Sequence, residues 1–183
     1  MCYTVAQHKI KEEMHYAYIS KKDKTVLTMN PFDKIGKQWM LITSGDEDKA
    51  NTMTASWGGV GVLWGSDVVY IFVRQSRYTK EFIDKTGHFS ISFLGEEYRK
   101  ALQHLGTVSG RDGDKISEAG VSVAYENGIP YIDEAELVLT CTALSATDIT
   151  MDQMLDAEIE PKWYADGDLH TMYVGKIEEI LVR

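Results

Sequence analysis

The sequence predicts a mainly β protein, a β-barrel with peripheral helices. Many short segments have the alternating or continuously apolar pattern of strands, few have helical spacing, and an Asn-Gly pair marks a tight hairpin turn. With 183 residues, of which 44% are hydrophobic and 26% charged, the chain is expected to form one domain with its own core.

Composition argues against several classes of function. The formal net charge of -9 argues against general nucleic-acid binding, because a phosphate backbone needs a basic protein face. The cysteines, Cys2 and Cys141, are too few and too scattered for a disulfide framework or a zinc site, and the five histidines show no metal spacing. No long apolar run or signal peptide is visible, so we expect a cytoplasmic protein without membrane segments.

Residues 1–37 are expected to form an N-terminal extension that wraps the surface or a partner subunit. This segment is polar and basic and has no clear periodicity, apart from a possible short strand at residues 25–29. The first clear strand pattern covers residues 39–43, so the main domain is expected to span residues 38–183.

Residues 51–57 (N-T-M-T-A-S-W) are typical of a half-buried strand, because Met53, Ala55 and Trp57 fall on one face and the hydroxyls of residues 52, 54 and 56 on the other. The short hydroxyls of one face could border a planar ligand. A glycine-rich stretch, 58–65, is expected to be a connection, and residues 68–73 have the continuous apolar pattern of a strand buried on both faces.

Residues 74–80 are expected to lead into a helix, with Ser76 as its N-cap and Gly87 as its end. Free N–H groups and the positive dipole end of a helix favour anions. The segment adds three cations and two hydroxyls that together suit a phosphate monoester: Arg74, Arg77, Lys80, Ser76 and Thr79. The alternative is a capped surface helix whose basic residues are only solvated.

The second half of the chain adds a helix and further strands. Apolar spacing predicts a helix over residues 98–105, and Asn127-Gly128 predicts a type I′ hairpin turn. A long strand is expected over residues 135–146 and a last strand over 170–182, where Gly175 would form a bulge. Between them, residues 151–168 are acidic and irregular, and their aspartates are expected to form turns.

The order and spacing of these motifs resemble the flavin reductase-like family of FMN-binding split barrels. The resemblance rests on N-T-M-T-A-S-W at 51–57, R-x-S-R-x-T at 74–79 and the strand at 89–94. Residues 106–115 resemble the family's G-x-x-S-G-x-x-x-D-K segment, and residues 170–177 its closing H-x-x-Y-x-G-x-I strand. The similarity covers residues 38–182.

The resemblance implies a split β-barrel that forms a homodimer, with FMN at each subunit interface. Its motif positions place the phosphate at Arg74, Ser76, Arg77 and Thr79, with Lys80 as a further candidate. The isoalloxazine ring or ribityl chain would be bordered by Met53, Thr54, Ala55, Ser56 and Trp57. His170 would lie near the flavin or substrate as a candidate catalytic residue, and a buried structural histidine is the alternative.

Three functions are consistent with these residues. The first is an NAD(P)H-dependent flavin reductase that passes electrons to free flavin or another acceptor, and the second is a flavoredoxin-like carrier without its own NAD(P)H turnover. The third is a non-catalytic flavin-binding protein. No metal site is expected.

Overall fold

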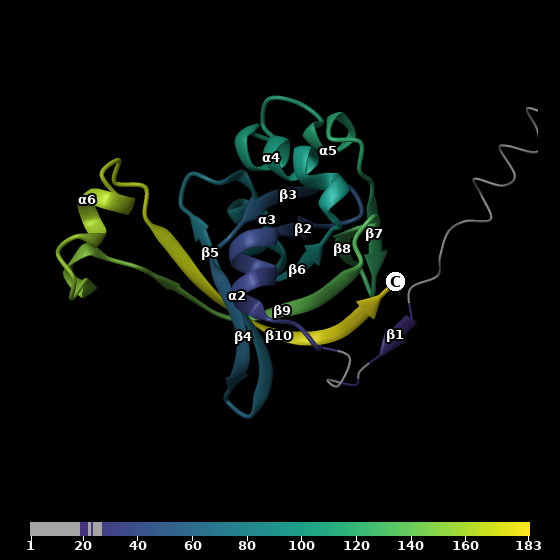
Figure 1. The fold of residues 1–183 in the computed structure, drawn as a ribbon, viewed down its shortest axis with the longest axis horizontal. Coiled ribbons are helices and arrows are strands. Elements are labelled where there is room, and N and C mark those ends of the chain that lie inside the picture. Colours follow the sequence, from purple (N-terminus) through teal and green to yellow (C-terminus); the bar gives the residue numbers. More distant parts are fainter. Residues whose placement is uncertain (1–18, 22, 24–26) are drawn as a thin grey trace, which may run out of the picture.

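The computed structural model describes residues 19–21, 23 and 27–183, and every structural statement below concerns these residues (Figure 1). Their main sheet has eight strands, which pair antiparallel in the order β3-β2-β6-β9-β10-β5-β4, with β1 added beside β10. A separate two-stranded sheet joins β7 and β8. The prediction of a mainly β fold is confirmed.

The strands have the following bounds: β1 (Ile19–Lys21), β2 (Met40–Gly45), β3 (Ala50–Ala55), β4 (Gly58–Leu63), β5 (Ser66–Arg74), β6 (His88–Phe93), β7 (Val123–Glu126), β8 (Ile129–Ile132), β9 (Leu137–Asp148) and β10 (His170–Val182). The helices are short: α2 (Pro31–Asp33), the π-helical η2 (Lys34–Gln38), α3 (Tyr78–Thr86), the 3-10 helix η3 (Glu96–Tyr98), α4 (Arg99–Thr107), α5 (Lys115–Glu118), the 3-10 helix η4 (Met151–Gln153) and α6 (Ile159–Trp163).

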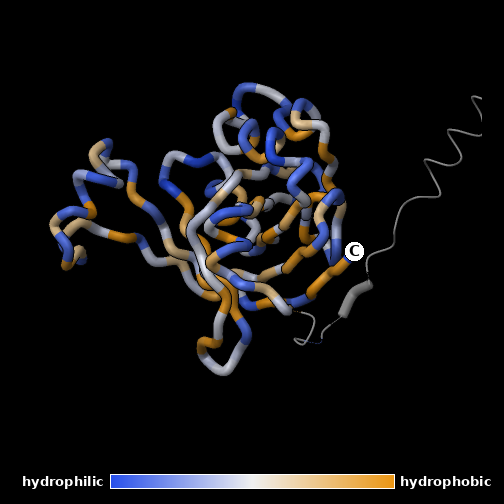
Figure 2. The backbone as a smooth tube through the Cα atoms, viewed as in Figure 1, coloured by the Kyte–Doolittle hydropathy of each residue, from blue (hydrophilic) through white to orange (hydrophobic). Residues whose placement is uncertain are grey.

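The sheet curls around the main hydrophobic core, and α4 and α5 lie together at one end of it (Figure 1). Apolar positions follow the strands inside the curl, whereas polar positions dominate the loops (Figure 2). A second apolar cluster, which includes Leu102, Leu105 and Ile132, lies beneath α4 and the β7–β8 hairpin. Ile35 of η2 belongs to the main core, so packing on the barrel begins before residue 38.

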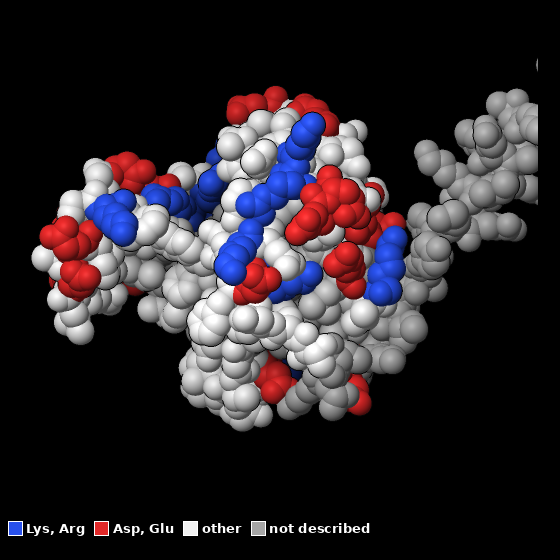
Figure 3. Space-filling view, in the orientation of Figure 1, with Lys and Arg blue, Asp and Glu red and all other residues white. Residues whose placement is uncertain are grey.

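The connection between β9 and β10 forms an arm, defined here as residues 149–169, which projects from the barrel and carries η4 and α6 (Figure 1). Acidic and basic side chains are interspersed on the face of the molecule in Figure 3, including this arm at its left. No helix in the described part of the chain is long and apolar enough to cross a membrane.

Gly175 forms the predicted irregularity in β10. The pairing of β10 with β9 shifts its register between Val174 and Gly175. A Cβ atom at Gly175 would lie 2.3 Å from Cζ of Phe89 and 2.9 Å from Cβ of Cys141. The glycine is therefore required by close packing of the core as well as by the bulge.

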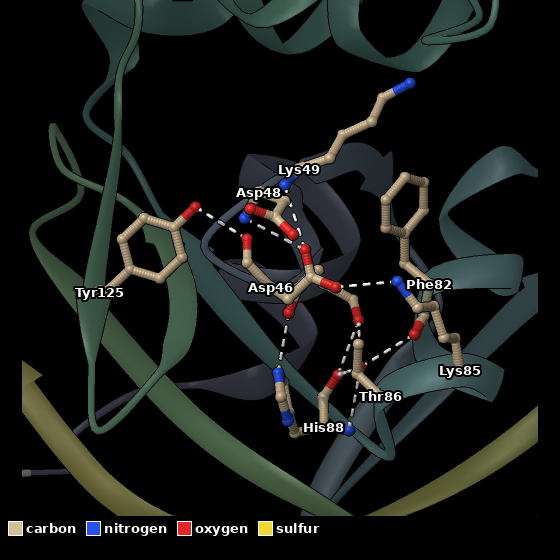
Figure 4. A network of polar contacts seen from close by, with 10 residues as sticks. Asp46, Asp48, Lys49, Phe82, Lys85, Thr86, His88 and Tyr125 are labelled. Carbon is tan, nitrogen blue, oxygen red and sulfur yellow. Dashed lines mark hydrogen bonds and ion pairs between the residues drawn. The ribbon is translucent and has the colours of Figure 1, made fainter.

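A polar network fixes the turn between β2 and β3, next to the end of α3 (Figure 4). The Asp46 carboxylate accepts hydrogen bonds from the backbone N–H of Asp48 and Lys49 and from the ammonium of Lys85, at 3.2, 3.1 and 2.9 Å. The Tyr125 hydroxyl donates to the Asp46 carbonyl at 3.1 Å. These contacts hold the start of β3 against α3.

Two sequence expectations about strands differ from the structure. Residues 58–65 are not a simple connection, since β4 pairs with β5 from Gly58↔Ile71 to Leu63↔Ser66. The glycines remove the side-chain pattern that identifies a strand but leave its hydrogen bonds intact. The strand expected at residues 25–29 lies partly outside the described residues, and its described part, 27–29, is not in a strand.

Candidate functional site

Two adjoining cavities lie where β3, the end of β5 and the start of β10 meet the first turn of α3. The first, the cationic cavity, has a volume of about 430 Å³ and is lined by Arg74, Arg77, Arg111 and Lys115 among other residues. The second, the aromatic cavity, has a volume of about 250 Å³ and is lined by residues 53–57, Phe72, Arg74, Arg77, Trp163 and His170. Met53, Arg74 and Arg77 line both, so the two cavities are adjacent.

The aromatic cavity contains every ring-side residue expected from the sequence: Met53, Thr54, Ala55, Ser56 and Trp57. The strand itself ends at Ala55, two residues earlier than expected. The Thr54 hydroxyl donates to the Leu102 carbonyl of α4 at 2.5 Å, and the Thr52 hydroxyl lies 2.9 Å from that of Thr43. These two hydroxyls of the predicted row therefore serve packing inside the protein.

His170 lies at the inner wall of the aromatic cavity and is 6% exposed. Its ring centroid is 5.0 Å from that of Trp57, and its Nδ1 is 3.0 Å from the Tyr164 hydroxyl. Burial, reinforced by the positive charge of Arg74, lowers the pKa of His170 to about 4. The imidazole is therefore neutral at physiological pH.

The arm closes one side of this cavity. Trp163 packs edge-on against Trp57, with ring centroids 5.2 Å apart and an interplanar angle of 84°. Tyr164 packs on His170 in a similar edge-on manner, at 5.5 Å. The indole of Trp57 is thus held between β10 and the arm.

The start of α3 differs in detail from the sequence expectation. The helix begins at Tyr78, and Arg77, not Ser76, occupies the N-cap position, without a side-chain cap. Ser76 is instead held by Asp168: its backbone N–H donates to Oδ1 at 3.0 Å and its hydroxyl donates to Oδ2 at 2.6 Å. Asp168 was expected only to form a turn. Its side chain also joins the end of the arm to Ser76, 92 positions earlier in the chain.

The remaining phosphate candidates divide into two groups. Arg74 and Arg77 line both cavities, and Thr79 lines the cationic one, where its hydroxyl accepts a hydrogen bond from Asn51 Nδ2 at 2.8 Å. Lys80 lines neither cavity: its ammonium donates to Asp84 at 2.7 Å. The structure therefore brings four of the five candidates together and turns Lys80 away from them.

The cationic cavity also contains Arg111 and Lys115, which were not among the expected site residues. Lys115 is 3% exposed, and its ammonium donates to the carbonyls of Leu105 and Val108 at 2.9 and 3.0 Å. Burial, followed by the nearby charge of Arg77, lowers the pKa of Lys115 to about 8. Both residues belong to the G-x-x-S-G-x-x-x-D-K segment, and this motif is the sequence pattern that could have indicated them as site residues.

Within the described residues, no group of three or more His, Cys, Asp or Glu side chains is arranged to hold a metal ion. The residues that line the cavities can bind an anion at one end and stack on or hydrogen-bond to a planar group at the other.

Comparison with known proteins identifies the family. A model of the flavin reductase like domain matches residues 32–183. The chain belongs to the flavin reductase-like family. An uncharacterized protein of Escherichia coli strain K12, YddH, is 32% identical over 152 residues, which covers 73% of this chain and 80% of that protein.

Solved structures support the same fold. A flavoredoxin from Methanosarcina acetivorans is similar with a TM-score of 0.64 at 24% identity, over 80% of this chain and 68% of that one. An FMN-binding protein from Thermus thermophilus is similar with a TM-score of 0.60 at 20% identity, over 78% of this chain and 68% of that one. The prediction of a split barrel with flanking helices is confirmed.

Proposed function

We propose that this protein binds FMN and acts as an oxidoreductase of the flavin reductase type, passing electrons from NAD(P)H through the flavin to free flavin or another acceptor. The observation that carries the proposal is that the cationic and aromatic cavities lie side by side and share Met53, Arg74 and Arg77. A flavin mononucleotide needs a cationic end for its phosphate and an aromatic or polar wall for its ring.

The residues present fit such a group. Arg74, Ser76, Arg77 and Thr79 would hold the phosphate, with Arg111 and Lys115 adding charge to the same cavity. The ring end would lie against residues 53–57, beside Trp57 and His170. Bound FMN would supply hydride and electron transfer, whereas the chain would bind it, orient it and limit access of water.

His170 acts in this proposal as a neutral group at the ring end. Because its pKa is lowered to about 4, it does not carry positive charge at neutral pH and can only exchange hydrogen bonds there. Its Nδ1 is already 3.0 Å from the Tyr164 hydroxyl, which leaves Nε2 for a ligand. This favours positioning of a flavin or nicotinamide over proton donation.

The alternatives are a flavoredoxin-like carrier and a flavin-binding protein without turnover. Steady-state oxidation of NADH and NADPH with added FMN, followed by anaerobic stopped-flow reduction of the bound flavin, separates these functions. A reductase oxidises the nicotinamide at catalytic rates. A carrier is reduced by dithionite but not by either nicotinamide, and absence of flavin binding refutes the proposal as a whole.

A homodimer and a cytoplasmic location complete the proposal. A second copy would cover the exposed Trp163 of the arm, which is 44% exposed and lines the aromatic cavity. Sedimentation equilibrium with and without FMN tests the assembly. A monomer that binds FMN with full affinity would separate flavin binding from dimer formation.

A further inference from the structure

Asp168 holds the hydrogen-bond donors that a phosphate would need at the start of α3. Its two carboxylate oxygens accept from the backbone N–H and the hydroxyl of Ser76, at 3.0 and 2.6 Å. An amide and a hydroxyl at the entrance to a helix are the donors that bind a phosphate monoester. A carboxylate on the same donors therefore competes with the phosphate for one position.

Arg74 is held by the same segment of the arm. One guanidinium nitrogen donates to the Asp168 carbonyl at 2.8 Å and to the Asp166 carboxylate at 3.3 Å, and the other donates to the Trp163 carbonyl at 2.9 Å. All three acceptors lie within residues 163–168. Arg74 and Ser76 together thus fasten this segment to the end of β5.

The fastened segment also forms part of the ring end of the site. Trp163 packs on Trp57, and the Tyr164 hydroxyl lies 3.0 Å from His170. Asp168 is therefore only a few residues along the chain from side chains that pack on Trp57 and His170 of the aromatic cavity.

We propose that the Asp168 carboxylate, which accepts from Ser76 and lies 3.9 Å from a guanidinium nitrogen of Arg74, competes with the flavin phosphate for these two residues. Phosphate binding would then displace the carboxylate and loosen residues 163–168. This inference rests on the proposed function. It makes Asp168 a determinant of affinity and of the preference for FMN over riboflavin: the carboxylate weakens binding of the phosphorylated flavin only. Flavin would then exchange more readily than in a site where these donors are unopposed.

The substitution Asp168→Asn tests the competition, because the amide has the size of the carboxylate but no charge. We expect the dissociation constant for FMN to fall about tenfold, because the substitution removes a negative charge that would repel the phosphate from Ser76. The constant for riboflavin should stay within about twofold. The control Asp112→Asn removes the same charge from the neighbouring cavity and should alter neither constant.

Unchanged or weaker FMN binding by Asp168→Asn would overturn the proposal and make Asp168 a structural clamp. If neither the wild type nor Asp168→Asn bound any flavin, the proposed function would fail. Binding of inorganic phosphate would still test whether Asp168 competes with a phosphate. Thermal stabilisation by phosphate should then be larger for Asp168→Asn than for the wild type. Equal stabilisation would overturn the proposal.

A measurement on the wild-type protein keeps the test independent of how the variant folds. Hydrogen exchange with and without saturating FMN should show faster exchange of amides 163–168, while the strands around the site become slower. Slower or unchanged exchange in this segment on FMN binding would contradict displacement of Asp168.

Discussion

The imidazole of His170 lies 5.0 Å from the indole of Trp57, with the two ring planes inclined by 37°. His170 is the first residue of β10 and pairs in register with Arg74, the last residue of β5. The aromatic cavity and the cationic cavity therefore meet at one pair of strand ends.

The burial of His170 predicts a pH dependence of stability. The folded pKa is about 4, against an ordinary value of 6.5, so between these pH values the unfolded chain binds a proton that the folded chain does not. Stability is therefore lost as the pH falls from 6.5 towards 4, by up to about 3 kcal/mol from this group. Above about pH 8 the imidazole is neutral in both states and contributes no slope.

Urea unfolding of the wild type and His170→Gln at pH 7.5 and 4.5 measures this contribution. Effects of the carboxylates cancel in the difference between the two proteins, and Gln can still hydrogen-bond to Tyr164. The variant should lose less stability on acidification than the wild type. Parallel losses would show that His170 is not held neutral by burial.

Arg77 and Lys80 form a matched pair of cations, three residues apart, of which only Arg77 lines the cavities. Arg77→Ala should weaken FMN binding by about 2 kcal/mol, the scale of a charge-assisted hydrogen bond, and the effect should shrink at high salt. Lys80→Ala should leave FMN affinity nearly unchanged, because its ammonium is paired with Asp84. Isothermal titration of both variants provides the test, and equal losses would contradict this division of roles.

Gly175 should tolerate no side chain. Its Cβ would lie 2.3 Å from Phe89 Cζ, so Gly175→Ala should lower the free energy of unfolding by about 2–3 kcal/mol through overpacking. Gly36→Ala is the control, since a Cβ there meets no atom within 4 Å, and it should cause no loss. Similar stabilities of the two variants in denaturant unfolding would refute the packing argument.

The fold was largely predictable because its strands have strong local patterns. The continuous apolar run of β5, the Asn127-Gly128 turn and the bulge at Gly175 all follow from short-range chemistry. β4 was missed because three of its six residues, Gly58, Gly59 and Gly61, have no side chain to show alternation. Its pairing with β5 is recognised only from the backbone hydrogen bonds of the structure.

The grouping of the candidate site residues was predictable where they are neighbours in sequence and not where packing brings distant segments together. Residues 53–57 form one local motif and Arg74, Ser76 and Arg77 another, and both sets line the cavities. Asp168 is separated from Ser76 by 92 positions, so no local pattern indicates their contact. Lys80 and Asp84 are at positions i and i+4 of α3, so their ion pair follows from local helix spacing, and this pattern argues against Lys80 as a phosphate ligand.

In the proposed function, the cationic cavity holds the phosphate of a flavin whose ring lies beside Trp57 and His170. The most direct measurement is a pair of fluorescence titrations of the wild-type protein, with FMN and with riboflavin, at low salt. We expect one FMN per chain, bound at least about tenfold more tightly than riboflavin, since one charge-assisted contact amounts to about 1.5–3 kcal/mol. Equal dissociation constants for the two flavins would contradict the claim.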